Sequence, residues 1–417
     1  MSEGIDMRHA ALRAVAAAAF CAAIAGSGLA KEVTPPPPAA DEPARIAEFE
    51  TTLDAAFATG DFVGLAVAVV SGGETTLLKT YGVIDAAGTQ VVEPGTVFRI
   101  ASLSKGIASS LAGIAFAEGR LSVDDSAARY APGFALMGGA EASLTLGHVM
   151  SHRSGLPPYA YDNLLEEGVP IDDILPRYAD VSLACPVGRC YAYQNIVFDF
   201  ISRALSSVYG KPYADIVEEK LFGPLGMTTA SVSETGLKES ASWARPHSRD
   251  RKKGSTAYGP WRAVPVKAAY YKTPASGGVN ASILDMAEWL KAQMGLRPEV
   301  LSPATLALIH APQVSTPPET ARIRPVSTRF GATQYGYGWR IYSYEGRKLI
   351  THSGTVDGYA AQIAFLPESG VGIVILSNAR SRRVWRIVPT FLDIELGLTR
   401  EDWLALNDGA AVGAGTP

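Results

Sequence analysis

Apolar runs joined by tight-turn residues occur near both ends of the chain, and they constrain the fold more than any other feature. Near the start, "GLAVAVV" (64–70) is separated by "SGG" from "ETTLLKTYG". Near the end, "GYAAQIAFL" and "VGIVILSN" flank "PESG". Each pair predicts a strand, a turn and a second strand. Two hairpins at opposite ends of the sequence predict one central antiparallel sheet in an α+β fold.

Helical periodicity accompanies both hairpins. Apolar residues recur every three or four positions in 46–57, and Gly60 ends the pattern, which predicts an amphipathic helix. "VWRIVPTFLDIEL" (384–396) predicts a second helix after the last hairpin. The middle of the chain, about 105–330, combines helical patterns with loops rich in Gly and Pro. We therefore expect helices flanking the sheet and a mostly helical subdomain beside it.

The N-terminal region is typical of an export signal. "MRHAALRAVAAAAFCAAIAGSGLA" places arginines before an apolar run and ends in small residues, and translation starts at Met1 or Met7. No later stretch reaches the roughly 20 apolar residues of a membrane span. We expect an exported protein, periplasmic or secreted, without stable membrane insertion. The expected segments are a signal peptide (1–30), a Pro-rich linker (31–44), a folded domain (45–400) and a flexible tail (401–417).

Charge excludes one class of partner. The chain has 417 residues with 37 Lys and Arg against 41 Asp and Glu, a net charge of −4, and no basic stripe or long Lys/Arg run stands out. Nucleic-acid binding requires a basic surface, so we exclude it. Small-molecule or peptide substrates remain, and we expect the chain to act as a monomer.

Cysteines outside the predicted signal form one pair. Cys185 and Cys190 enclose Pro-Val-Gly in "CPVGRC", where the spacer favours a turn. In an oxidising compartment two cysteines across a turn predict a disulfide, with two free thiols as the alternative.

A serine and a lysine are spaced for chemistry in "FRIASLSKGIASSLAGIAFAEG" (98–119), where Ser102 precedes Lys105 by three positions. Residues three apart on a helix lie on one side of it. A serine in the first turn lies beside free backbone N–H groups that can stabilise an oxyanion, and a desolvated lysine can act as a base. Ordinary helix starts also contain this spacing, so other residues must decide.

Further polar motifs follow in chain order. Tyr193 and Asn195 lie two residues apart in "CYAYQNIVFDFISRAL", and His352-Ser353-Gly354 follows an apolar strand in "LITHSGTVDGYAAQIAFLP". A phenol near a lysine can relay a proton, an amide can hold a substrate amide, and a strand glycine allows a substrate to approach closely. Three such motifs together indicate a catalytic site.

These motifs resemble those of the serine hydrolases of the class C β-lactamase and DD-peptidase superfamily, the penicillin-recognising enzymes. "RLSVDDSAARYAP", "LTLGHVMSHRSGLP", "SGGVNASILDMAEWL" and "YGYGW" also resemble blocks of that family, in the same order. The resemblance covers about 45–396. It implies a β-lactamase/transpeptidase-like fold, with the site between the sheet and the helical subdomain.

The resemblance also implies catalytic roles. Ser102 would be the acylated nucleophile. Lys105 and Tyr193 would share the roles of base and proton relay, and the sequence leaves open which of the two is the base. For Lys105 to be neutral near pH 7, its pKa must fall by about 3 from its ordinary value, through burial and nearby like charges.

Substrate-binding roles follow in the same way. Asn195 would bind the substrate amide, and the strand with His352, Ser353 and Gly354 would line the opposite wall of the cleft. The backbone N–H groups of the nucleophile and of Thr355 would form the oxyanion hole. β-Lactamases usually have Lys-Thr-Gly where this chain has His-Ser-Gly. If His352 faces a substrate carboxylate, it should bind it best when protonated; the alternative is that His352 only packs at a strand end and does not meet the substrate.

Neither metals nor cofactors are expected. His148 and His152 have the i, i+4 spacing of some zinc sites, but no Glu follows His148 and the segment resembles a structural block of the family. We predict an exported serine hydrolase that acts through an acyl-enzyme on amide bonds of β-lactams or D-Ala-D-Ala-type peptides. A carboxylesterase of the same superfamily and a non-catalytic protein that binds cell-wall peptides are the alternatives.

Overall fold

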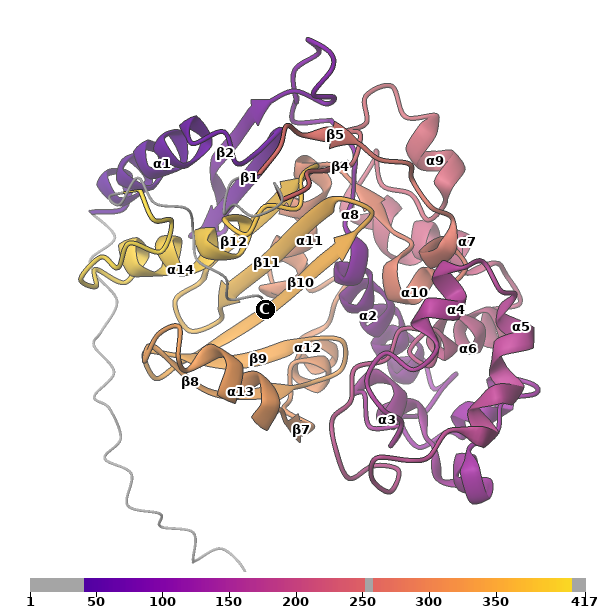
Figure 1. Ribbon diagram of the computed structural model, residues 1–417. Coiled ribbons are helices and arrows are strands. Elements are labelled where there is room, and N and C mark those ends of the chain that lie inside the picture. The colour runs from indigo at the N-terminus through magenta and orange to yellow at the C-terminus, as the bar shows by residue number, and fades with distance from the viewer. Residues whose placement is uncertain (1–40, 252–257, 407–417) are drawn as a thin grey trace, which may run out of the picture.

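An eight-stranded antiparallel sheet forms the centre of the computed structural model, which describes residues 41–251 and 258–406 (Figure 1). Strands from the start of the chain join strands from its end, because β1 pairs with both β2 and β12. The order across the sheet is β2 (Glu74–Gly82), β1 (Gly64–Ser71), β12 (Val371–Ser377), β11 (Tyr359–Leu366), β10 (Arg347–Val356), β9 (Arg340–Tyr344), β8 (Phe330–Tyr335) and β7 (Val314–Ser315).

Helices cover both faces of this sheet. Alternate side chains of β1 point to opposite faces: Leu65 packs with the terminal helices α1 (Glu42–Ala58) and α14 (Val384–Glu395), whereas Ala66 belongs to the larger core on the other side. Every residue from Gly64 to Val70 is therefore buried. This explains why the strand is continuously apolar instead of alternating.

The helical region lies between β2 and β8 in the sequence. Figure 1 shows α2 at the boundary between this region and the sheet. Two short strand pairs also occur here, β3 (Phe98–Arg99) with β6 (Asn280–Ala281) and β4 (His247–Ser248) with β5 (Arg262–Ala263). Its helices are α2 (Ser104–Ala117), α3 (Leu146–Met150), α4 (Asp162–Glu166), α5 (Ile171–Ile174), α6 (Phe200–Tyr209), α7 (Tyr213–Val217), α8 (Gly223–Leu225), α9 (Glu234–Lys238), α10 (Pro274–Gly277), α11 (Ile283–Gln293), α12 (Pro303–Ile309) and α13 (Pro317–Ile323).

This arrangement confirms the predicted fold class, with a central antiparallel sheet, flanking helices and a mostly helical part. The predicted signal peptide (1–30) lies outside the described residues. Helix α1 begins at Glu42, within the segment predicted to be linker. Across 41–251 and 258–406, no helix combines the length and the apolar character needed to cross a bilayer.

The predicted flexible tail (401–417) begins with packed residues, which corrects that boundary. Trp403 is buried, and its indole Nε1 donates to Asp393 Oδ2 at 2.8 Å. Glu401 accepts a hydrogen bond from Arg329 Nε at 2.7 Å. This packing is not visible in the local sequence, because Arg329 and Phe330, which contact Glu401 and Trp403, lie at the start of β8, far from the tail in sequence.

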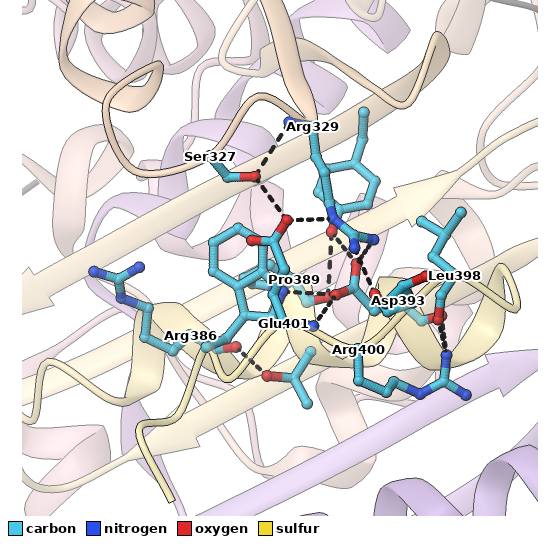
Figure 2. A network of polar contacts seen from close by, with 12 residues as sticks. Ser327, Arg329, Arg386, Pro389, Asp393, Leu398, Arg400 and Glu401 are labelled. Atoms are coloured by element: carbon cyan, nitrogen blue, oxygen red, sulfur yellow. Dashed lines mark hydrogen bonds and ion pairs between the residues drawn. The ribbon is translucent and has the colours of Figure 1, made fainter. Parts of the chain in front are cut away.

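Asp393 on α14 is the centre of this polar network (Figure 2). Its carboxylate is buried, and Oδ1 accepts from Arg329 Nη1 at 2.6 Å and from the Tyr344 hydroxyl at 2.5 Å. A buried charge is tolerated only when it is paired and hydrogen-bonded, as this one is. The network therefore joins α14, the sheet and the C-terminal segment.

Replacing Asp393→Asn should lower the free energy of unfolding by about 3–5 kcal/mol, because the substitution leaves the Arg329 guanidinium without its buried counter-charge. Urea denaturation followed by circular dichroism measures this. Glu48→Gln is the matched control, since Glu48 pairs with Arg400 at 2.6 Å near the surface. That change should cost less than about 1 kcal/mol. Equal losses in the two variants would contradict the role assigned to Asp393.

Candidate active site

Ser102 lies in a single 3-10 turn, η2 (Ala101–Leu103), and α2 begins at Ser104. The preceding residue, Ala101, has a φ of 49°, a left-handed conformation that is unfavourable for a residue with a Cβ. The turn leaves Ser102 partly exposed, whereas Lys105, in the first turn of α2, is completely buried. The nucleophile candidate is thus accessible and the lysine is shielded from water.

The Lys105 amine has three polar neighbours. Its Nζ lies 2.7 Å from Asn195 Oδ1, 3.0 Å from the Ser276 carbonyl oxygen and 3.5 Å from Ser102 Oγ. The first two neighbours can only accept hydrogen bonds. A neutral amine has two N–H groups and one lone pair, so these acceptors occupy both N–H groups. The lone pair is then left for the Ser102 hydroxyl.

Burial adjusts the proton affinities in the direction that base catalysis requires. Desolvation lowers the pKa of Lys105 to about 7; the Asp162 carboxylate opposes this shift, and the Arg340 guanidinium adds to it. Desolvation raises the pKa of Tyr193, and the nearby Arg340 and a hydrogen bond with Ser102 only partly oppose this. Lys105 can therefore lose its proton near neutral pH, whereas Tyr193 keeps its proton. The geometry favours Lys105 as the base.

Tyr193 and Asn195 come from an irregular segment before α6. The predicted disulfide between Cys185 and Cys190 is confirmed, with Cα atoms 6.3 Å apart, and it closes a loop just before Tyr193. The Tyr193 ring lies beside the amine, with Lys105 Nζ 4.7 Å from its centroid. The segment thus brings the predicted tyrosine and asparagine to Lys105.

Strand β10 packs closely against the nucleophile turn at Gly354. A Cβ at this position would lie 2.6 Å from the Ile100 carbonyl oxygen and 2.8 Å from the Ser102 amide nitrogen. Such distances are too short for any side chain, so glycine is required here. Thr355, the next residue, is exposed, and Ser353 is partly exposed. The predicted strand therefore reaches the site at its Gly354–Thr355 end.

His352 differs from the expectation that it faces a substrate carboxylate. Its side chain is fully buried: Nε2 lies 3.0 Å from the Tyr335 hydroxyl and Nδ1 lies 2.9 Å from the Ser353 carbonyl oxygen. A carbonyl accepts only, so Nδ1 carries the proton and Nε2 accepts from Tyr335. Desolvation, reinforced by Arg340 and Lys105, holds the pKa of His352 well below its usual value. The imidazole is neutral and provides no cation for a substrate.

His152 continues this chain of hydrogen bonds. The Gln194 backbone N–H donates to His152 Nδ1 at 3.2 Å, so the proton of the ring is on Nε2, which lies 3.2 Å from the Tyr335 hydroxyl. Its ring also packs against Tyr193, with centroids 4.2 Å apart. Buried hydrogen bonds thus connect the Tyr193 segment to β10 through Tyr335. His152 is structural in this arrangement, as the sequence analysis expected.

Residues that the sequence analysis did not identify complete the site. Ser276, on α10, provides the carbonyl for Lys105, and Asp162, on α4, accepts a hydrogen bond from Asn195 Nδ2 at 2.6 Å. Arg340, on β9, pairs with Glu319 beside the Tyr193 ring. Ser276 begins the block "SGGVNASILDMAEWL" and Arg340 directly follows "YGYGW", but neither block indicated a role for them. Only the tertiary contacts place these two residues and Asp162 in the site. Among the described residues, no group of three or more His, Cys, Asp or Glu side chains is arranged to hold a metal ion.

The catalytic efficiency kcat/KM for a neutral ester should rise with pH through about 7, as Lys105 loses its proton. Lys105→Arg keeps the charge but removes the base, and should lower kcat/KM by about 10²–10⁴-fold. A pH–rate profile measures both effects, with the melting temperature of the variant as the folding control. A profile that rises only at strongly alkaline pH would instead assign the base role to Tyr193.

Curated proteins with similar sequences include hydrolases. An unguisins hydrolase of Aspergillus campestris is 25% identical over 364 residues, and protein flp of Staphylococcus aureus is 24% identical over 349 residues. Each alignment covers 82% of this chain but only 64% of the relative, so the chain spans just under two thirds of these proteins.

A solved structure with a similar fold is a penicillin-binding protein homologue. An octameric penicillin-binding protein homologue from Pyrococcus abyssi superposes with a TM-score of 0.71 and 21% sequence identity, over 86% of this chain and 78% of the homologue. The family model described as "Beta-lactamase" matches residues 49–390, which include the Ser102, Tyr193 and His352 motifs. The chain belongs to the beta-lactamase family.

Proposed function

We propose that this protein is a serine hydrolase that forms an acyl-enzyme on Ser102. The observation that carries the proposal is the environment of Lys105, whose two N–H groups have acceptors at 2.7 and 3.0 Å while Ser102 Oγ is its third neighbour. A buried amine with a pKa of about 7 in this position suits general-base activation of a hydroxyl.

The reaction begins with transfer of the Ser102 hydroxyl proton to Lys105, as the oxygen attacks the substrate carbonyl. The backbone N–H groups of Ser102 and Thr355 stabilise the resulting oxyanion. Lys105 returns the proton, through the Tyr193 hydroxyl, to the leaving group, and the carbonyl re-forms as an ester with Ser102. Water, activated in the same way, then hydrolyses the ester and regenerates the serine.

The proposed substrates are amide bonds of β-lactams or D-Ala-D-Ala-type peptides. Membership of the beta-lactamase family and the similarity to a penicillin-binding protein homologue support this class. An unguisins hydrolase among the relatives supports hydrolysis more generally. The presence of Ser102, Lys105 and Tyr193 together also argues against a purely binding role, because a binding protein does not need all three.

Carboxylesterase activity is the second candidate, and the charge distribution of the site favours it. His352 is neutral and buried, and Glu319 neutralises the Arg340 guanidinium. Apart from Lys105, therefore, neither His352 nor Arg340 presents an unpaired positive charge beside Tyr193. A substrate without a carboxylate would fit such a site well.

Export is a further part of the proposal. The signal-like N-terminal sequence supports it, and so does the disulfide between Cys185 and Cys190, since disulfides persist in oxidising compartments. We propose a periplasmic or secreted monomer. Cell fractionation and the mass of the purified protein in solution measure location and oligomeric state directly.

Covalent labelling should identify the nucleophile. After mixing with a fluorophosphonate or penicillin, intact-mass spectrometry should show one adduct on the wild-type protein. The adduct should disappear in Ser102→Ala and form more slowly in Lys105→Ala, because the hydroxyl loses its base. Ser109→Ala, a buried serine elsewhere on α2, is the matched control and should label normally. Unchanged labelling of Ser102→Ala would show that another residue is acylated.

A substrate panel should separate the two candidate functions. We expect turnover of p-nitrophenyl acetate together with either nitrocefin or a D-Ala-D-Ala peptide. Because His352 is neutral, the pH profiles for carboxylate-bearing and neutral substrates should rise in parallel around pH 7, where Lys105 loses its proton. A KM for the charged substrate that worsens selectively between about pH 6 and 8 would show that a histidine does bind the carboxylate. Turnover of the ester alone would favour the carboxylesterase.

A further inference from the structure

Asp162 is a buried carboxylate beside the site that the proposed reaction does not yet use. It is the first residue of α4, and the turn before it contains two left-handed residues, Tyr159 with φ 58° and Tyr161 with φ 64°. Asp162 is 8% exposed. Its Oδ2 accepts from Asn195 Nδ2 at 2.6 Å, and its Oδ1 has no hydrogen-bond partner within the described part of the chain.

The side-chain amide of Asn195 lies between Asp162 and Lys105. An amide can present either its oxygen or its NH₂ group to a neighbour, and the two orientations have nearly the same shape. An ionised carboxylate can only accept a hydrogen bond. Asp162 therefore holds the NH₂ group on its own side, which directs Asn195 Oδ1 toward Lys105 Nζ, 2.7 Å away.

The opposite orientation would disable a neutral lysine. An NH₂ group pointed at Lys105 would donate to the amine lone pair, which Ser102 needs. The acceptor count would also change, since only the Ser276 carbonyl oxygen, 3.0 Å away, would remain for the amine N–H groups. The orientation of one amide thus decides whether Lys105 can receive the serine proton.

We propose that Asp162 is a positioning residue for the general base: through Asn195 it keeps the lone pair of Lys105 directed at Ser102. Its negative charge also raises the pKa of Lys105, as Asp199 does, against the larger effect of burial and the charge of Arg340. The inference rests on the proposed acyl-enzyme function of the same site. It assigns a role to a carboxylate that touches neither the nucleophile nor the base directly, and it predicts an effect on the pH profile that packing alone does not produce.

The effect of Asp162 on the pKa of Lys105 depends on whether its carboxylate is ionised. Desolvation raises the pKa of Asp162 to about 6, and the hydrogen bond from Asn195 and the charge of Lys105 oppose this shift. The carboxylate is thus mostly ionised at neutral pH, where its charge raises the pKa of Lys105 against the larger effect of burial. Titratable groups that interact with Asp162 from the surrounding elements are Lys105, Glu166, Tyr178, Tyr193 and Tyr270.

Two substitutions separate orientation from charge. Asp162→Asn keeps an acceptor for Asn195 but removes the charge, so the acid limb of kcat/KM should move about one pH unit lower, with the plateau largely kept. Asp162→Leu removes acceptor and charge and excludes water, so Asn195 is free to reorient. The plateau should then fall by at least about tenfold, which is less than the roughly 10²–10⁴-fold expected for removal of the base itself, because Lys105 remains but is misdirected.

Glu166→Gln is the matched control. Glu166 lies on the same short helix, but it accepts from the Tyr270 hydroxyl at 2.7 Å and has no hydrogen bond to Asn195. Removing its charge should shift the acid limb by much less than Asp162→Asn does. Melting temperatures and circular dichroism establish folding for each variant.

The rate of fluorophosphonate labelling of Ser102, measured from about pH 5 to 9, supplies the readout. A folded Asp162→Leu variant with the wild-type plateau, or an Asp162→Asn variant with an unmoved acid limb, would overturn the inference. If Asp162→Leu does not fold, the acid limb of Asp162→Asn alone decides. Absence of labelling on the wild-type protein would instead refute the proposed function, so the two failures are distinguishable.

Discussion

A lysine amine removed from water is the feature on which the rest of the site depends. Lys105 is completely buried, and a buried ammonium without compensation is strongly disfavoured. The chain compensates with two oxygen acceptors from different segments, Asn195 and the Ser276 carbonyl. The result is an amine near its titration point, with one direction open to the nucleophile. Stability alone would favour an apolar side chain here, and the burial of a lysine with a lowered pKa therefore supports the catalytic role proposed for it.

The positions of these partners depend on contacts between distant parts of the chain. Arg99, just before the nucleophile turn, is fully buried and contacts Asp357 at 2.7 Å, at the turn between β10 and β11. The same guanidinium donates to the Lys267 carbonyl oxygen at 3.2 Å and lies 4.1 Å from the centre of the Tyr271 ring. Arg99 thereby connects the segment that leads to α10 and Ser276 with the strand that carries Gly354.

Histidine in β10 is best understood as part of the scaffold. The hydrogen bonds from His152 through Tyr335 to His352 define the tautomer of each ring, and burial keeps both rings neutral. A lysine at position 352 would have to place a charge in this buried chain. The difference from the usual Lys-Thr-Gly motif therefore changes the electrostatics of the cleft wall, because a neutral structural ring occupies the place of a cation.

Much of the fold, together with the disulfide and the family, could be predicted from the sequence. The hairpins at both ends, the helices beside them, the Cys185–Cys190 disulfide and the family were predicted from local patterns, and the structure or the comparisons confirm each of them. Local patterns suffice here because strand alternation, helical periodicity and turn residues act over short distances. Ser102 and Lys105 were recognisable for the same reason, since one helical turn determines their spacing.

Tertiary structure alone decided which groups surround the lysine. Ser276 begins one family-like block and Arg340 follows another, whereas Asp162 lies in no motif. The roles of all three arise because loops and strands far apart in the chain meet at α2. The neutral state of His352 and the packed start of the tail were also invisible in the sequence, because both depend on burial by distant residues. The sequence determined the scaffold and indicated Ser102 as the candidate nucleophile. The fold determined the protonation states, since these depend on desolvation and on charges brought close only in three dimensions.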